Sequence, residues 1–502
     1  MSASSLYMEV PVLSLLAAGA AVIVQPVSST DSSPPTSNSA DQTAVPAGTP
    51  SPIVTGEAAS SPTDREASVL SGPQNKLIVY DENYSALSDP ALRRNLWASL
   101  KYIPLSGDSY LSLGGESRTR LEFRDQQRFG LGPQDNNGNL EQRTRLWADL
   151  HIGEHVRTFF ELKSGVEAGY SVPPTLSDRK PVDIGQAFLD LSQNLGDDGS
   201  VTLRVGRQEI SIGSFRLFDV RDGLNVRRSL DAARLMFTKG KWNGELLGGY
   251  AQAETIFSFD NPTNYDFSFF GARLARATSF GTIEGLWIQS DRDNASYDLG
   301  VAHERRDIFS LHATGHAKRV EFDVEAIGEV GRWGADKVRA GYISVNGSYL
   351  LDLGLKAKIG ARMESASGDT NRHDHIMGTY FSLFARPVTL NGELGRSNLT
   401  LFGPSASIQP TKKLTLDFNL DDLRRTTSND GIYMGSGALL RSASSGRSHQ
   451  VGTRFIVGAR YTVSPFVLVG AYFNHIWAGR YLKEGAVGKD LNYTAFYTAL
   501  RF

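Results

Sequence analysis

The stretch Leu111–Arg124 reads LSLGGESRTRLEFR, and it decides how the rest of the chain is interpreted. One set of alternate positions is apolar or small and ends in Leu121 and Phe123, whereas the intervening positions include Arg118 and Arg120. Because successive side chains of a strand point to opposite faces, this pattern predicts one apolar face and one densely charged face. In a transmembrane barrel the apolar face meets lipid and the charged face lines a wet lumen.

The same two-faced pattern recurs along the chain, in residues 141–152, 156–163, 184–191, 320–330, 355–364, 414–421 and 451–461. Residues 282–288 do not alternate cleanly, so their facing stays open. A long polar connection over residues 125–140 is followed by a tight return at residues 153–155, and this alternation is typical of outer-membrane barrels. The chain ends in a strand pattern with the terminal aromatic Phe502, which resembles the signal read by the barrel-insertion machinery.

Composition narrows the class of protein. The chain of 502 residues has no cysteine, which excludes disulfides and thiolate metal sites, and its net charge of −2 does not suggest a nucleic-acid partner. No apolar run after residue 30 reaches the ~20 residues of a membrane helix. Residence in a membrane therefore requires a closed barrel, in which every strand backbone is paired. The alternative is a large soluble β-protein.

The chain divides into three predicted regions. Residues 1–27 resemble a signal peptide with an apolar core, although the first nine residues lack Lys and Arg. Residues 28–75 are rich in Ser, Thr and Pro and are predicted to be a disordered leader. Residues 76–502 are predicted to form an all-β transmembrane antiparallel barrel, after a short helix over Asp89–Leu96. Strands of ~10 residues allow ~16–18 strands around an aqueous, charged lumen.

Several motifs resemble the alginate export family of bacterial outer-membrane porins. They are Tyr80-Asp81-Glu82, the run from Leu100 to Leu105, Val205-Gly206-Arg207-Gln208-Glu209 with the arginine-rich stretch after it, and the run from Asn398 to Pro404. Membership would imply an 18-stranded monomeric barrel that conducts an acidic polysaccharide through an arginine-rich pore. The family also handles other substrates, so alginate itself stays open.

The basic lumen faces carry the functional prediction, because a guanidinium holds a carboxylate by two hydrogen bonds and many such contacts, each weak in water, let a polyanion slide. Residues 208–229 are expected to fold into the lumen as a positive constriction. The expected polyanion pathway comprises Arg118, Arg120, Arg143, Arg145, Lys163, Arg204, Arg207, Arg216, Arg221, Arg227, Arg228, Arg362, Arg454 and Arg460. Acidic braces of the lumen wall are expected at Glu116, Glu122, Asp149, Glu161, Glu321, Asp323 and Glu325. Under the alternative interpretation these charges only stiffen the wall, and Asp219 and Asp222 neutralise a loop that caps the barrel mouth.

Three functions therefore stay open. The first is an outer-membrane pore for passive, anion-selective export of an acidic exopolysaccharide such as alginate. The second is a general diffusion porin for small anionic nutrients. The third is a barrel enzyme, for which Glu321 and Asp323 share a strand face but no Gly-x-Ser-x-Gly motif occurs. No catalytic residue, cofactor or metal is expected, because two histidines in the polar run His373-Asp374-His375 are not a specific metal pattern.

Expected partners are an anionic polysaccharide, outer-membrane lipid and lipopolysaccharide, the barrel-insertion machinery and periplasmic polymer-export proteins. The barrel is expected to be a monomer.

Overall fold

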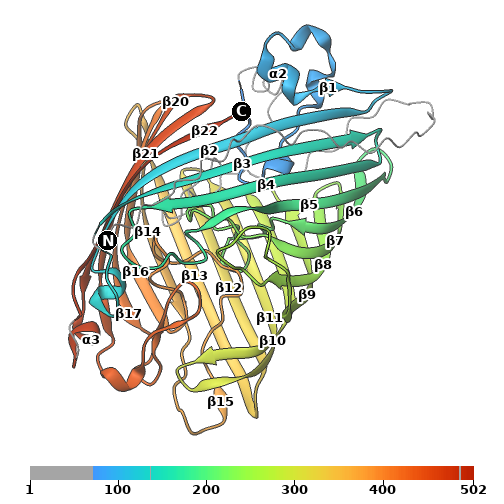
Figure 1. Ribbon diagram of the computed structural model, residues 1–502. Coiled ribbons are helices and arrows are strands. Elements are labelled where there is room, and N and C mark those ends of the chain that lie inside the picture. Colours follow the sequence, from blue (N-terminus) through green and yellow to red (C-terminus); the bar gives the residue numbers. More distant parts are fainter. Residues whose placement is uncertain (1–71, 136, 486–487) are drawn as a thin grey trace, which may run out of the picture. The chain divides into compact units, whose positions relative to one another are not determined.

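The computed structural model describes residues 72–135, 137–485 and 488–502. The expected signal peptide and all but four residues of the expected leader lie outside this part of the chain. Eighteen antiparallel strands form a closed barrel, because each strand pairs with its neighbour along the chain and the last pairs with the first (Figure 1). The strands are β2 (Tyr110–Asp125), β3 (Gly138–Ile152), β4 (Val156–Ala168), β5 (Lys180–Asn194), β6 (Gly199–Gln208), β7 (Leu230–Lys239), β8 (Trp242–Gln252), β9 (Thr263–Ala277), β10 (Gly281–Tyr297), β11 (Gly300–Ala317), β12 (Val320–Trp333), β13 (Asp336–Asp352), β14 (Lys356–Ala366), β16 (Leu399–Thr411), β17 (Leu414–Arg425), β20 (Gln450–Ser464), β21 (Val467–Ala478) and β22 (Leu491–Arg501).

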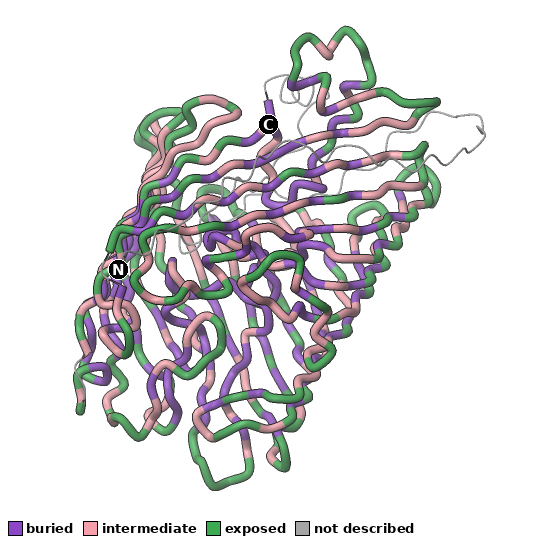
Figure 2. Tube along the Cα trace, in the orientation of Figure 1, coloured by how far each residue is buried: buried purple, intermediate pink, exposed green. Residues whose placement is uncertain are grey.

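Burial alternates along these strands as the sequence predicts (Figure 2). In β2, Arg118 and Arg120 are each 5% exposed, whereas Leu121 is 39% and Phe123 is 45% exposed. The polar face therefore points into the barrel and the apolar face points outward, toward lipid. In β10, where the sequence left the facing open, Ile288 is buried on the inner side.

The connections differ between the two ends of the barrel. One end has turns of two to four residues, such as 153–155 and 412–413, and both described chain ends lie at this end. The other end has the long loops, of which 209–229 and 367–398 matter most for the lumen. Outer-membrane barrels place short turns in the periplasm and long loops outside the cell, which fixes the orientation.

The segment before the barrel differs from the expectation of a helix over Asp89–Leu96. Asp89 caps only a short 3-10 turn, η3 (Pro90–Leu92), and the α-helix is α2 (Leu96–Lys101). The helix begins later because the Asn95 side chain accepts a hydrogen bond from the Ala98 amide at 2.8 Å and so supplies its N-cap. Within the described residues, no helix combines the length and apolarity that crossing a bilayer requires.

Three segments pack inside the barrel against its inner wall. Residues 77–80 contact inward aromatic side chains of β3, β4 and β5. The 209–229 loop and part of the 367–398 loop share an apolar cluster with the inner faces of β7–β13. The rest of the 367–398 loop packs on β20–β22. The lumen is therefore partly filled by apolar contacts, whereas the sequence led us to expect an aqueous, charged lumen narrowed by residues 208–229 alone.

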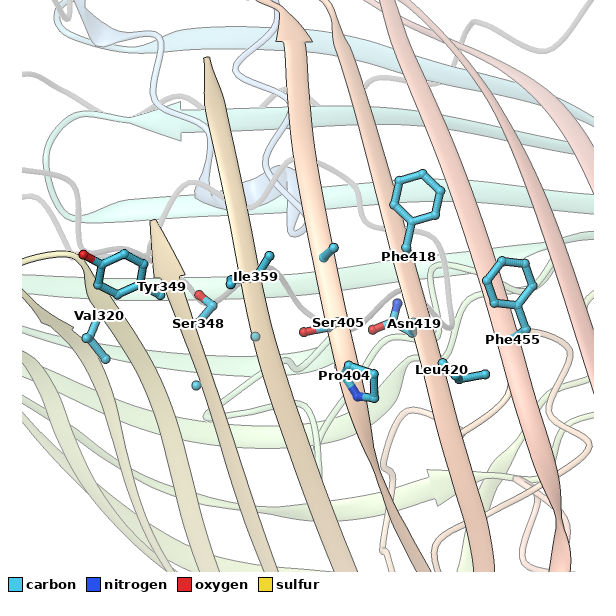
Figure 3. A pocket seen from close by; sticks show the side chains of 13 residues that line it. Val320, Ser348, Tyr349, Ile359, Pro404, Ser405, Phe418, Asn419, Leu420 and Phe455 are labelled. Carbon is cyan, nitrogen blue, oxygen red and sulfur yellow. The ribbon is translucent and has the colours of Figure 1, made fainter. Parts of the chain in front are cut away.

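A separate hollow of about 710 Å³ lies in the barrel wall, where β12–β14 adjoin β16, β17 and β20 (Figure 3). Tyr349, Ile359 and Leu420 line it, and they are among the exposed apolar side chains of the outer face. The small residues Gly347 and Ala406 leave space between the large side chains. The hollow therefore opens on the lipid-facing surface and is distinct from the lumen.

Candidate pore constriction

The 209–229 loop crosses the lumen from one wall to the other. It leaves β6 through the sequence Val205-Gly206-Arg207-Gln208-Glu209, in which Gly206 has a φ of +133° and a Cβ would lie 2.3 Å from the carbonyl oxygen of Ala187. Only glycine fits this close approach, which explains the glycine of the motif. On the opposite wall, Arg216 contacts the Asp323 carboxylate of β12 at 2.8 Å. The predicted fold-back of this segment into the lumen is present.

A buried ion cluster fixes the centre of this loop. Arg227 donates two hydrogen bonds to the Glu209 carboxylate, at 2.6 and 2.7 Å, and also contacts Asp222. From the wall, Arg143 reaches Asp222 at 2.9 Å and Arg145 reaches Glu209 at 3.3 Å. Salt bridges with good geometry offset the cost of burying these charges, so the cluster holds the loop in one position.

Two further wall arginines bind the backbone of the loop. Arg118 donates to the carbonyl oxygens of Asp222 and Leu224 at 2.8 and 2.7 Å, and Arg120 donates to that of Gly223. The guanidinium groups that make these contacts are ones that we expected, from the sequence, to bind a polyanion. Arg118 and Arg120 therefore position the loop in this structure.

The N-terminal segment, residues 72–84, adds a second layer of contacts from the short-turn end. The Tyr80 hydroxyl donates to the Glu209 carbonyl at 2.5 Å, and the Leu77 carbonyl accepts from Arg227 at 2.8 Å. The guanidinium of Arg204 lies over the Tyr80 ring, 4.0 Å from its centroid. This segment therefore occupies part of the lumen on the periplasmic side of the loop.

The 367–398 loop approaches from the long-loop side. Arg386 contacts the Asp219 carboxylate at 2.9 Å, and Val388 offers its carbonyl to Arg454 at 2.5 Å. The two inserted loops and the wall together define a constriction. We did not predict from the sequence that Arg386 and the 367–398 loop enter the lumen. The length of this connection between β14 and β16 was the one feature that could have indicated it.

Three cations at this constriction make no ion pair with any described residue. Arg221 and Arg228 are half-buried neighbours, because the Arg228 amide donates to the Val220 carbonyl at 2.9 Å. The third, Lys163, donates to the Arg227 carbonyl at 3.1 Å. Burial and the charge of Arg221 lower the pKa of Arg228 to about 9, which still leaves its guanidinium charged at neutral pH. The Glu254 carboxylate lies near all three cations but forms no ion pair with any of them, so these cations remain available to attract an anion.

Arg118 also makes no ion pair with any described residue, but its guanidinium donates to the carbonyl oxygens of Asp222 and Leu224. The other predicted cations have carboxylate partners. Ion pairs join Arg120 to Glu122 and Glu141, Arg143 to Glu116, Arg145 to Glu161, Arg204 to Asp190, Arg207 to Asp231, Arg216 to Glu325, Arg362 and Arg454 to Asp421, and Arg460 to Asp417. Among the predicted braces, Asp149 contacts Arg157 at 2.7 Å and Glu321 contacts Lys358 at 2.7 Å. Arg460 lies on β20.

The contacts of Glu321, Asp323 and His375 concern the alternatives of a barrel enzyme and of a metal site. Glu321 contacts Lys358 at 2.7 Å, whereas Asp323 contacts Arg216 and His312, each at 2.8 Å. His375 is exposed and contacts Asp336 at 2.9 Å. Glu321 and Asp323 therefore take part in the charge network of the barrel wall.

The fold defines a class of protein: the chain is an integral β-barrel pore of the bacterial outer membrane. The sequence profile of the alginate export family matches residues 109–495, so the chain belongs to the alginate export family. No curated protein that we compared matches the sequence.

Solved structures agree with the fold. The chain is similar to OpdK of Pseudomonas aeruginosa, solved with vanillate, at 11% identity and a TM-score of 0.53, covering 78% of this chain and 98% of that one. It is also similar to OpdO of the same organism, at 13% identity and a TM-score of 0.53, covering 78% and 97%. OccAB4 of Acinetobacter baumannii gives 10% identity and a TM-score of 0.53, with the same coverage. At these identities the likeness concerns the fold.

Proposed function

We propose that this barrel is a passive, anion-selective pore that exports an acidic exopolysaccharide of the alginate type. The observation that carries the proposal is the cluster of Lys163, Arg221 and Arg228, whose charges are not neutralised by ion pairs in the described chain. Membership of the alginate export family suggests the kind of polymer, and the unpaired cations would attract its repeated carboxylates. Each carboxylate of the polysaccharide would bind a pore cation weakly enough to be replaced there by the next carboxylate of the polymer.

The test compares two double variants in planar bilayers. Arg221→Ser with Arg228→Ser removes two unpaired lumen charges, whereas Lys412→Ser with Lys413→Ser removes two exposed charges from the turn between β16 and β17. We expect the first variant to lose most of its anion selectivity and its block by uronate oligomers, and the second to behave as the parent. Unchanged reversal potential and unchanged block in the first variant would reject the proposal.

A second function is favoured by the filled lumen. Residues 77–80 and the two inserted loops narrow the path, which suits the uptake of small carboxylates better than the passage of a polymer. OpdK, a protein of similar fold, was solved with vanillate, which is a small carboxylate. Oligomer length separates the two functions: an exporter is blocked more strongly as the uronate chain lengthens, whereas an uptake pore responds equally to monomers and longer chains.

A further inference from the structure

Four basic side chains form a row on the outer face of the barrel, at its long-loop end. Arg305 of β11 lies opposite Arg332 of β12 in the strand register, and Arg332 lies opposite Lys337 of β13. Arg339 follows two residues along β13 on the same face. All four are exposed, whereas the alternate neighbours Arg306 and Val338 are buried on the inner side. Like charges directly opposite one another on adjacent strands are destabilising unless an external anion compensates them.

The row has no ion pair with any described residue. Arg305 donates to the Gln289 side-chain oxygen at 2.7 Å, which leaves its charge uncompensated. At the short-turn end, by contrast, exposed cations do pair: Arg319 contacts Asp352 at 2.9 Å and Lys239 contacts Asp198. Other exposed cations, such as Lys412 and Lys413, are also unpaired among the described residues, so what distinguishes the row is that its four cations lie side by side on adjacent strands.

The acidic groups nearest the row have other partners. Asp291, which faces Arg305 in the register, contacts His303 at 2.9 Å. Asp307 accepts hydrogen bonds from Trp287 at 3.1 Å and from Gln289 at 3.3 Å. These contacts leave the side of the row along β12 and β13 positively charged.

An apolar strip begins directly below the row on the same three strands. Phe309 is 52% and Leu311 is 62% exposed on β11, and Val330 and Ile343 continue the strip on β12 and β13. At ~3.3 Å per residue, Arg305 and Phe309 are about 13 Å apart along the strand. The surface thus presents cations at headgroup level and apolar side chains at the level of acyl chains.

We propose that this row, Arg305, Arg332, Lys337 and Arg339, binds the phosphate groups of a phosphorylated glycolipid in the outer leaflet of the outer membrane. Guanidinium and ammonium groups bind phosphate oxygens by charge-assisted hydrogen bonds. The position at the extracellular end selects the outer leaflet, and the strip below it accommodates the acyl chains. Several cations spaced along adjacent strands fit a headgroup with more than one phosphate.

The experiment measures binding of bis-phosphorylated lipid A to the purified barrel in detergent, by the shift in its melting temperature. The test variant replaces Arg305, Arg332, Lys337 and Arg339 by Gln. The matched control replaces four exposed lysines of the short-turn end, Lys241, Lys356, Lys412 and Lys413, by Gln. Heat-modifiable migration in electrophoresis verifies that both variants are folded.

We expect lipid A to raise the melting temperature of the parent and of the control, and to bind the test variant at least tenfold more weakly. Dephosphorylated lipid A should bind all three proteins equally weakly, and added salt should weaken binding to the parent. Equal affinity of parent and test variant, or equal binding of the dephosphorylated lipid to the parent, would overturn the proposal. An equal effect of phosphatidylglycerol would also overturn it, because the row would then not select a glycolipid.

Discussion

Phe218 and Phe384 join the two loops that enter the barrel. The Phe384 amide donates to the Leu217 carbonyl at 2.9 Å, the Asp219 amide donates to the Phe384 carbonyl at 3.1 Å, and the two rings lie 5.5 Å apart. Both side chains are buried. The constriction is therefore held by a short backbone pairing between segments that are far apart in the sequence.

Phe384→Ala should loosen this junction. Truncation of a buried Phe costs ~3–5 kcal/mol of stability. We expect this loss to weaken the contact between the two loops while the barrel stays folded. We expect larger and noisier single-channel conductance with unchanged heat-modifiable migration. Phe309→Ala, on the exposed outer face, serves as the control and should leave the conductance unaltered. Quiet, parent-like channels in Phe384→Ala would contradict a role of this junction in narrowing the lumen.

The facing of β3 predicts two different defects at adjacent positions. Leu146 is 51% exposed on the outer face, and Arg at the bilayer midplane costs ~2–4 kcal/mol there, so Leu146→Arg should impair membrane insertion. Arg145→Leu should insert but unfold more readily, because it leaves the buried Glu161 carboxylate without its cationic partner, at a cost of ~3–5 kcal/mol. Urea unfolding in liposomes and membrane fractionation separate the two effects, and identical defects would refute the facing.

The N-terminal segment should restrict flow through the lumen. Tyr80→Ala removes the hydroxyl that binds the Glu209 carbonyl and the ring beneath Arg204. We expect the segment to detach and conductance to rise severalfold, while the reversal potential keeps its sign. Tyr102→Ala, which alters a side chain outside the lumen cluster of residues 77–80, is the control. A conductance equal to that of the parent would mean that the segment does not obstruct the path.

Glu393 predicts a pH dependence of the 367–398 loop. Burial raises the pKa of its carboxyl to about 7, whereas an unfolded Glu titrates near ~4.3. The folded loop therefore binds the proton more tightly, and its stability is full below pH ~4 and falls as the pH rises toward 7. Hydrogen exchange of residues 386–395 should accelerate between pH ~4 and about 7 beyond its intrinsic rate. Glu393→Gln should abolish this extra acceleration, and its persistence would assign the titration to another group.

Deletion of Phe502 should slow assembly. Its backbone exchanges two hydrogen bonds with Gly115 of β2, at 3.0 and 3.1 Å, at the closure of the barrel. We expect periplasmic degradation and little heat-modifiable protein, whereas Phe502→Trp, which keeps an aromatic terminus, should assemble. Normal barrel levels after the deletion would exclude Phe502 as an assembly signal.

The sequence by itself determined the barrel, the facing of most strands and the folding of the 209–229 segment into the lumen. These features follow from a period of two residues and from the length of the connections, which are local properties of the chain. The helix position was misjudged because two capping residues, Asp89 and Asn95, compete within a few positions and only Asn95 begins an α-helix.

Only the tertiary structure decided which cations are neutralised. Arg386 and its partner Asp219 are 167 residues apart, and Arg227 meets the Leu77 carbonyl across 150 residues. Such pairs depend on how loops cross the lumen, and neither composition nor periodicity encodes that path. Arg227 and Arg228 are adjacent in the sequence and look alike there, yet the first is locked in an ion cluster and the second makes no ion pair among the described residues. The difference arises because neighbouring loop residues point to different surroundings once the chain has folded.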